Sequence, residues 1–152
     1  MKRLVIACDH HGFDLKQAIL AQTTYENIEV AWLDVGCSGD QRTDYPIFAR
    51  HAVRELLSGT VEGGILLCGT GVGMAVAANR FRGVYAALVW CPEVARRAKE
   101  EDNANFICVP ADYLSVDCVR AIMQQWLLAT FQAGRYQERL LAIDQDISSA
   151  KP

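Results

Sequence analysis

We expect the chain to adopt an α/β fold, with a mainly parallel, doubly wound sheet of five strands and helices on both faces. Two observations predict this class. Short apolar runs of strand length alternate along most of the chain with stretches whose apolar residues recur at helical spacing. Each apolar run is followed by a polar or glycine-containing turn. Such alternation is typical of parallel sheets, because a helix usually carries the chain back between parallel strands.

The elements follow in order along the sequence. The predicted strands are Leu4–Cys8, Val30–Val35, Gly64–Cys68, Val84–Val89 and Phe106–Val109. The helical patterns between them cover Phe13–Gln22, Ile47–Ser58, Met74–Phe81 and Glu93–Glu101. After the last strand, Ser115 or Asp117 is placed to cap a long helix whose apolar residues, out to Phe131, have core spacing. We therefore expect one domain over residues 1–152, with a C-terminal helical extension over about residues 115–147.

Composition narrows the possible partners and compartment. The 152 residues are 51% apolar and 22% charged, with a formal net charge of −3, so no general attraction to nucleic acid or to acidic lipid is expected. The six cysteines form no C-x-x-C pair, which favours free thiols in a reducing cytosol. The first residues enter a strand directly, and no apolar run reaches membrane-spanning length. We expect a cytoplasmic protein with no nucleic acid and no membrane partner.

The most informative segment is the turn after the third predicted strand. Cys68 ends that strand, and Gly69, Gly71 and Gly73 alternate before an Ala-rich helix. Glycines allow the backbone to approach a ligand and turn its N–H groups inward, and the following helix directs its positive end to the same place. A thiol beside such an anion-binding turn is in a position where a thiolate is stabilised.

Two nucleotide-binding motifs fit this turn poorly. A dinucleotide fingerprint opens the first strand–helix unit and is followed by an acidic residue after the next strand, whereas this turn follows the third strand and the next one ends in Val89-Trp90-Cys91. A Walker loop needs Lys and Ser or Thr after its last glycine, where this chain has Met74 and Ala75. A small phosphorylated ligand suits the turn better. Right-handed crossovers bring the loop after Cys8 to the same sheet edge.

Four segments, taken together, resemble the ribose-5-phosphate isomerase B family, also called RpiB/LacAB, over almost the whole chain. They are Cys8-Asp9-His10-His11-Gly12, Arg42-Thr43-Asp44-Tyr45-Pro46, Ile65–Gly73 and Gly134-Arg135-Tyr136-Gln137-Glu138-Arg139. The resemblance implies a Rossmann-like three-layer α/β/α sandwich and an aldose–ketose isomerase of phosphorylated sugars. It also implies that no metal or other cofactor is used, and that a homodimer or dimer of dimers shares its active sites between subunits.

The resemblance also implies roles for individual residues. Cys68 matches the family's general base, which moves a proton between neighbouring carbons. Thr70 and the backbone of Gly69, Gly71, Val72 and Gly73 match the donors that stabilise an enediolate.

The remaining matched residues bind substrate. Asp9 and His10 match residues that contact the sugar and its phosphate end, and Arg135 and Arg139 match the pair that contacts phosphate. Without this context Cys68 would be interpreted as a core residue, and the two arginines as an exposed helix face.

One position departs from the family pattern. Ribose-5-phosphate isomerases of this family have a histidine, commonly followed by asparagine, where this chain has Glu101 and Asp102. The stretch looks closer to the B subunit of galactose-6-phosphate isomerase. Ring opening then falls to Glu101, to His11 or to spontaneous opening in solution, and Asp102 takes the asparagine's place in substrate binding. We expect an isomerase that interconverts ribose 5-phosphate and ribulose 5-phosphate. The alternatives are an isomerase of a hexose or tetrose phosphate, and a sugar-phosphate-binding module without turnover.

Overall fold

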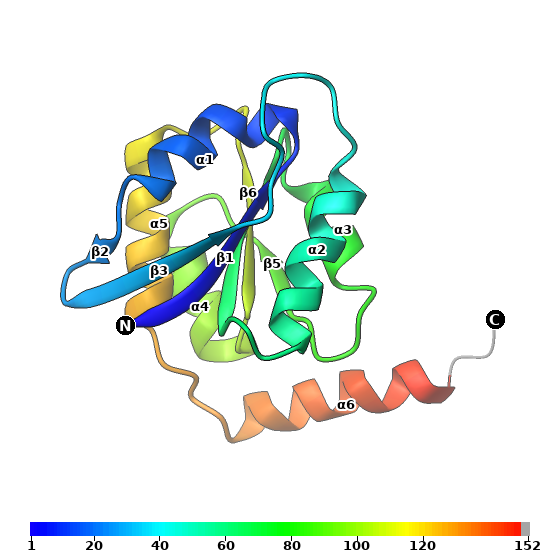
Figure 1. Cartoon of the computed structure of the whole chain (residues 1–152). Helices are drawn as coiled ribbons and strands as arrows, with labels where there is room; N and C mark the ends of the chain where they lie inside the picture. Colours follow the sequence, from blue (N-terminus) through cyan, green and yellow to red (C-terminus); the bar gives the residue numbers. More distant parts are fainter. Residues whose placement is uncertain (150–152) are drawn as a thin grey trace.

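Six strands form one sheet in the order β2-β3-β1-β4-β6-β5 in the computed structural model, which describes residues 1–149 and the side chains of residues 1–145 (Figure 1). The strands are β1 (Lys2–Cys8), β2 (Thr24–Tyr25), β3 (Ile28–Asp34), β4 (Gly63–Cys68), β5 (Ala86–Leu88) and β6 (Phe106–Pro110). The helices are η1 (His10–Gly12), α1 (Phe13–Leu20), α2 (Tyr45–Leu57), α3 (Val72–Ala78), α4 (Pro92–Asp102), α5 (Val116–Leu128) and α6 (Arg135–Ser149).

The centre of the sheet is parallel and places two loops side by side. Strand β1 pairs in parallel with β3 on one side and with β4 on the other. The chain passes from β1 outward to β3, then crosses to β4 on the other side of β1 and continues to β5 and β6 on that side, so its direction of winding reverses between β1 and β4. Ligands of open α/β sheets bind at this kind of reversal, beyond the carboxyl ends of the strands. The loops after Cys8 and Cys68 meet there.

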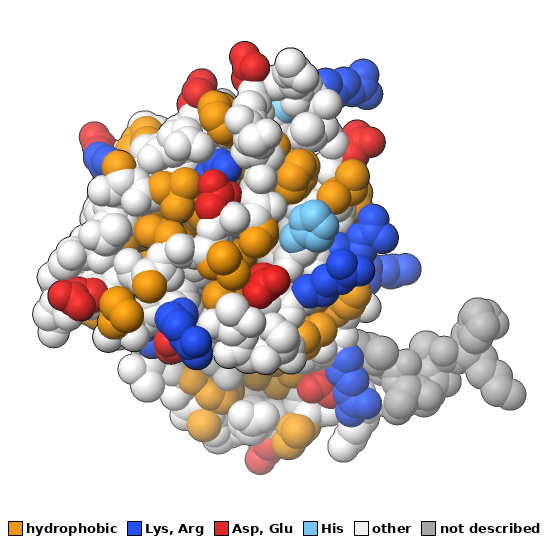
Figure 2. Space-filling view, in the orientation of Figure 1, with side chains coloured by type: hydrophobic (Ala, Val, Ile, Leu, Met, Phe, Trp, Pro, Cys, Tyr) orange, Lys and Arg blue, Asp and Glu red, His pale blue; other side chains and the backbone are white. Residues whose placement is uncertain are grey.

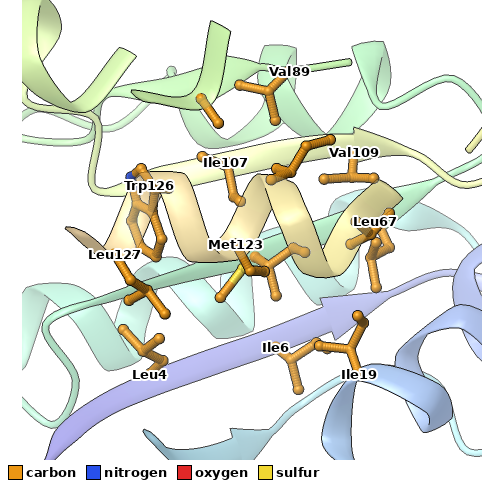
Figure 3. Close-up of a cluster of buried hydrophobic side chains, with 14 of the residues drawn as sticks. Leu4, Ile6, Ile19, Leu67, Val89, Ile107, Val109, Met123, Trp126 and Leu127 are labelled. Atoms are coloured by element: carbon orange, nitrogen blue, oxygen red, sulfur yellow. The ribbon is translucent and has the colours of Figure 1, made fainter. Parts of the chain in front are cut away.

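Helices cover both faces of the sheet and bury separate apolar clusters. Helices α1, α4 and α5 pack on one face, while α2 and α3 pack on the other. On the first face, Met123, Trp126 and Leu127 of α5 lie over side chains of β1, β4 and β6 (Figure 3). The indole N–H of Trp126 donates to the carbonyl of Ala104 at 3.0 Å, which satisfies its only polar atom inside the core.

The predicted three-layer α/β/α sandwich is confirmed, but the sheet has six strands instead of five. The extra strand, β2, is two residues long and antiparallel to β3. Glu26, in the turn between them, has a positive φ of 53°. A two-residue strand is too short to show periodicity, so only the burial of Tyr25 against the core reveals its role.

The prediction of one long helix that includes Phe131 is wrong, because two helices, α5 and α6, occupy the region. Ser115, one of the two predicted caps, does cap α5 by accepting the N–H of Cys118 at 3.3 Å. Helix α5 ends, however, at Leu128. Phe131 therefore lies in the connection instead of on the helix. Ala133 and Gly134 both have positive φ, and this reverses the chain into α6.

Helix α6 lies at the end of the sheet opposite the carboxyl ends of β1 and β4 (Figure 1), where Leu140 is buried and the Tyr85 hydroxyl donates to Asp144 Oδ2 at 2.7 Å. Acidic, basic and apolar side chains are interspersed on the face in Figure 2, apart from Lys and Arg side chains grouped along its right side. Among residues 1–149, no helix is long and apolar enough to cross a membrane.

Candidate active site

Cys68 and the glycine turn are fixed by the end of the sheet. The N–H of Ala111 donates to the carbonyl of Cys68 at 2.9 Å, and that of Asp112 to the carbonyl of Gly69 at 3.1 Å, so the pairing of β4 with β6 continues into the turn. Gly71 is left-handed, with φ of 72°, and a Cβ atom there would lie 2.6 Å from Leu88 Cδ1. A side chain is therefore disfavoured at Gly71 by both conformation and space.

Asp9 and His10 lie beside this turn, at the end of β1. Asp9 is buried, with 6% of its surface exposed, and accepts the N–H of His11 at 3.0 Å. Burial is the largest influence on the Asp9 carboxyl and raises its pKa. The backbone N–H of His10 donates to Thr43 Oγ1 at 3.1 Å, and Thr43 N–H lies 3.2 Å from His10 Nδ1. The loop before α2 therefore orients His10.

His11 forms a pair with Asp112 across the turn. His11 Nδ1 lies 3.0 Å from Asp112 Oδ1, and about half of each side chain is exposed. Hydrogen bonding to Asp112, together with its negative charge, raises the pKa of His11. A Cβ atom on Gly69 would lie 2.6 Å from Asp112 Oδ2, so the pair passes directly over the residue after Cys68.

Most of these groups line one pocket of about 300 Å³, but His10 is not among its lining residues. Its lining residues are Asp9, His11, Tyr45, Cys68, Gly69, Thr70, Gly73 and Asp112. The pocket combines a thiol, two carboxyl groups, an imidazole and two hydroxyls, which can move protons on a small polar ligand. Within residues 1–149, no group of three or more His, Cys, Asp or Glu is arranged to hold a metal ion.

Glu101 and Asp102 are not in this pocket. Glu101 Oε1 lies 2.8 Å from Arg97 Nε, one turn earlier on α4. This bond, followed by the charges of Arg97, Arg135 and Arg139, lowers the pKa of Glu101 despite some opposing desolvation. Asp102 lines a separate pocket with residues at the start of β5 and with Leu140 and Ile143 of α6.

Arg135 and Arg139 join Glu101 at that end of the molecule. Their guanidinium carbons lie 5.0 and 5.5 Å from the ring centre of Tyr136, so both arginines flank one aromatic ring. Both are exposed. With Arg97, they give the cluster three positive charges against the one negative charge of Glu101, which suits a dianion.

The structure thus separates the predicted site into two half-sites. Helix α4 starts at the carboxyl edge of the sheet, after β5, and runs back, so Glu101 and Asp102 reach the opposite edge. The six residues of β4 alone span about 20 Å. We call the pocket around Cys68 the thiol half-site, and Glu101, Arg135 and Arg139 the arginine half-site. Within one chain, they cannot contact the same small sugar.

Sequence reasoning missed two lining residues. Tyr45 received no role from the sequence, yet it begins α2, and its ring is 2.8 Å from where a Cβ on Gly73 would lie. Asp112 belongs to no recognisable sequence motif. It could have been found only from its position two residues after β6, at the same edge of the sheet as the other strand-end loops.

Comparisons with known proteins agree with this geometry. The model of the Ribose/Galactose Isomerase family matches residues 4–143. The chain is 36% identical over 143 residues to ribose-5-phosphate isomerase B of Escherichia coli, covering 94% of this chain and 95% of that one. It is also 36% identical over 147 residues to galactose-6-phosphate isomerase subunit LacB of Clostridium acetobutylicum, covering 96% and 84%.

Solved structures of the family share the fold. The ribose 5-phosphate isomerase RpiB of Thermotoga maritima superposes with a TM-score of 0.89 at 38% identity, covering 95% of this chain and 98% of that one. Ribose-5-phosphate isomerase B of Mycoplasma genitalium, solved with bound ribulose-5-phosphate, gives a TM-score of 0.88 at 34% identity, covering 97% of both chains. The chain belongs to the ribose/galactose isomerase family, a family of aldose–ketose isomerases.

Proposed function

We propose that this enzyme interconverts ribose 5-phosphate and ribulose 5-phosphate, with Cys68 as the general base. The observation that carries the proposal is the position of Cys68, at the end of a buried strand and in one pocket with Asp9 and Thr70. The E. coli and T. maritima relatives named as ribose-5-phosphate isomerases support this substrate pair.

The chemistry divides among the groups of the thiol half-site. The Cys68 thiolate takes the proton from C2 of the open aldose, and the electron pair becomes the double bond of an enediolate. Returning the proton to C1, while a proton passes from O2 to O1, gives the ketose. The Thr70 hydroxyl and the N–H groups of Gly69, Gly71, Val72 and Gly73 are the donors that we assign to the developing negative charge. Asp9 and His10 hold the sugar hydroxyls.

The phosphate group requires the arginine half-site, which we assign to a second copy of the chain. In a homodimer or dimer of dimers, Arg135 and Arg139 of one subunit bind the phosphate of a sugar whose C2 faces Cys68 of the other. Glu101 and Asp102 come with these arginines. Guanidinium groups make charge-assisted hydrogen bonds to a phosphate dianion, so the half-sites complement one another.

The surface supports such an assembly. Val72 and Val76 of α3 are exposed beside the thiol half-site, and Leu141 and Ile143 of α6 are exposed beside the arginine half-site. Within the described part of α6, only Leu140 is buried against its own chain. Apolar side chains left uncovered near both half-sites favour contact with another subunit.

A six-carbon substrate is the second candidate, because the LacB subunit of C. acetobutylicum is as similar as the E. coli enzyme. A tetrose phosphate is a third candidate. It cannot close into the same ring as ribose 5-phosphate, so it does not need the family's histidine that Glu101 replaces here. The test is a turnover assay with four-, five- and six-carbon aldose phosphates, coupled to detection of each ketose.

We expect the five-carbon pair to give the largest kcat/KM. A larger kcat/KM for a hexose or tetrose phosphate would replace the proposed substrate. Thermal stabilisation by sugar phosphates without any product would instead identify a binding module.

A further inference from the structure

A histidine and a carboxylate meet beside Cys68 without a role in the chemistry above. His11 comes from the turn after β1 and Asp112 from the turn after β6, on either side of β4. His11 Nδ1 lies 3.0 Å from Asp112 Oδ1, so the two side chains meet across the edge of the sheet. Both line the pocket that contains Cys68.

We propose that His11, oriented by Asp112, is the acid that opens the ring of the cyclic sugar phosphate before Cys68 acts. This inference rests on the proposed function and adds its missing first step. His11 is a catalytic residue in this scheme, because it contacts the ring oxygen, and Asp112 is a positioning residue.

The contact with Asp112 determines which nitrogen of His11 is available to donate a proton to a ligand. Nδ1 is engaged with Asp112 Oδ1, which leaves Nε2 as the nitrogen that can reach a ligand. A Cβ on Gly69 would lie 3.3 Å from His11 Nδ1, so the imidazole sits above the residue that follows the base. An acid and a base on the same pocket wall can act in turn on neighbouring atoms of one sugar.

The charged surroundings favour the protonated form of His11. Asp112 raises the pKa of His11 first by hydrogen bonding and then by its charge, desolvation opposes this increase, and the charge of Asp9 adds a smaller increase. The other polar side chains that line the pocket are Cys68 at the end of β4, Thr70 in the glycine turn and Tyr45 of α2.

His10 also stands close to His11, with its ring centre 4.4 Å away. Its Nδ1 is engaged with Thr43, so it is already committed to the loop before α2.

Glu101 is a poorer proton donor than His11. Its ion pair with Arg97 favours the carboxylate and lowers its pKa, so little of it carries a proton near neutral pH. A group held in that state accepts protons instead of giving them, even where a second subunit brings it to the sugar.

His11 alone gives and recovers the proton that ring opening requires. The imidazolium gives its Nε2 proton to the ring oxygen as the bond from C1 to that oxygen breaks, and the bonding pair stays on the oxygen. The C1 hydroxyl forms the second bond of the carbonyl and returns its proton to Nε2. His11 ends as it began, and the open aldose is ready for loss of its C2 proton.

The test measures how the aldose rate of His11→Gln depends on enzyme concentration. At trace enzyme, we expect turnover of ribose 5-phosphate to fall by about 10²-fold or more, the usual loss for a general acid. As enzyme is raised, the rate of the variant levels off at the spontaneous ring-opening rate, because only the open form is consumed. The wild-type rate keeps rising in proportion. His51→Gln, an exposed histidine on α2, is the matched control and should match wild type.

A His11→Gln rate that stays proportional to enzyme at every concentration, or one that equals wild type, overturns the proposal. If the substitution only disturbed the structure, the rate of His11→Gln would be lower than that of wild type but would still rise in proportion to enzyme concentration. If wild type converts a different cyclic sugar phosphate of the panel, the same experiment uses that sugar. If wild type converts none, the proposed function itself fails.

Asp112→Asn tests the positioning role separately. It keeps a side chain of the same size but removes the charge that raises the pKa of His11, so the alkaline limb of the aldose pH–rate profile should move to lower pH. An unmoved alkaline limb would show that the pair only links two strand ends.

Discussion

The thiol half-site and the arginine half-site both present polar side chains but are built in different ways. In the first, Cys68 and Asp9 come from strand ends, are almost fully buried and are held by backbone hydrogen bonds. In the second, Arg135 and Arg139 stand on an exposed helix and flank Tyr136. The first has its base and a carboxyl group buried, while the second has its arginines exposed.

This difference matches what each step requires. Removing a proton from carbon needs a base held at a defined position, which a strand end in a packed sheet provides. Binding a phosphate dianion needs charge and long side chains that can follow the ligand, which exposed arginines provide. The contrast predicts that substitutions in the thiol half-site reduce kcat, whereas those in the arginine half-site change KM.

The largest effect is expected from Cys68→Ala. Removing the general base should lower kcat by about two to four decades, with little change in fold, because Ala fits the strand end. Turnover of ribose 5-phosphate measures it. Cys118→Ala, a half-exposed thiol on α5, is the control. Near-normal turnover in Cys68→Ala would remove this thiol from the mechanism.

A smaller effect is expected from Arg135→Ala and Arg139→Ala. Each should raise KM for the phosphorylated sugar by the equivalent of about 1.5–3 kcal/mol, the usual worth of a hydrogen bond to a charged group. Binding of the unphosphorylated sugar should hardly change. Arg50→Ala, on the exposed side of α2, serves as the control. Equal weakening of both sugars would give the arginines a structural role instead.

Glu101→Gln should act on KM and leave the proton chemistry alone. Since Glu101 partly neutralises its neighbouring arginines, its removal should lower KM by up to about fivefold, the scale of an exposed ion pair. The alkaline limb of the aldose pH–rate profile should stay in place. A Glu101→Gln variant whose aldose rate becomes independent of enzyme concentration would make Glu101 the ring-opening acid in place of His11.

The smallest effect concerns stability. Because folding raises the pKa of His11, its pair with Asp112 stabilises the fold below the ordinary histidine pKa, and this contribution disappears as pH rises through the raised value. Half-exposed partners keep it below about 1 kcal/mol. The loss of Tm caused by Asp112→Asn should therefore be larger at about pH 5 than at about pH 8.5. An equal loss at both pH values would contradict the ion pair.

Sequence periodicity was sufficient for most of the fold. It located the five longer strands and the helices on both faces, since buried strands such as β4 are continuous apolar runs. It failed where local pattern carries little information. Strand β2 has two residues, and the break before α6 depends on the backbone of Ala133 and Gly134 more than on hydrophobicity.

The site was predictable in part for a related reason. Cys68 and the glycines form a contiguous motif, so their proximity follows from sequence. The pairing of His11 with Asp112 joins residues 101 positions apart, and no local pattern encodes it. The separation of Glu101 from Cys68 could have been predicted, because a helix that follows a strand returns to the opposite edge of the sheet.

The central claim, that the two half-sites join across subunits, is tested most directly by a mixed dimer. One subunit carries Cys68→Ala and the other carries Arg135→Ala with Arg139→Ala, and two affinity tags isolate the heterodimer. Ribose 5-phosphate is assayed below the KM of the arginine variant. If sites are shared, one of the two sites in each heterodimer is intact, and activity should return to about half that of wild type per dimer. If each chain holds its own complete site, both sites remain defective, and a heterodimer no more active than its parents would contradict the account.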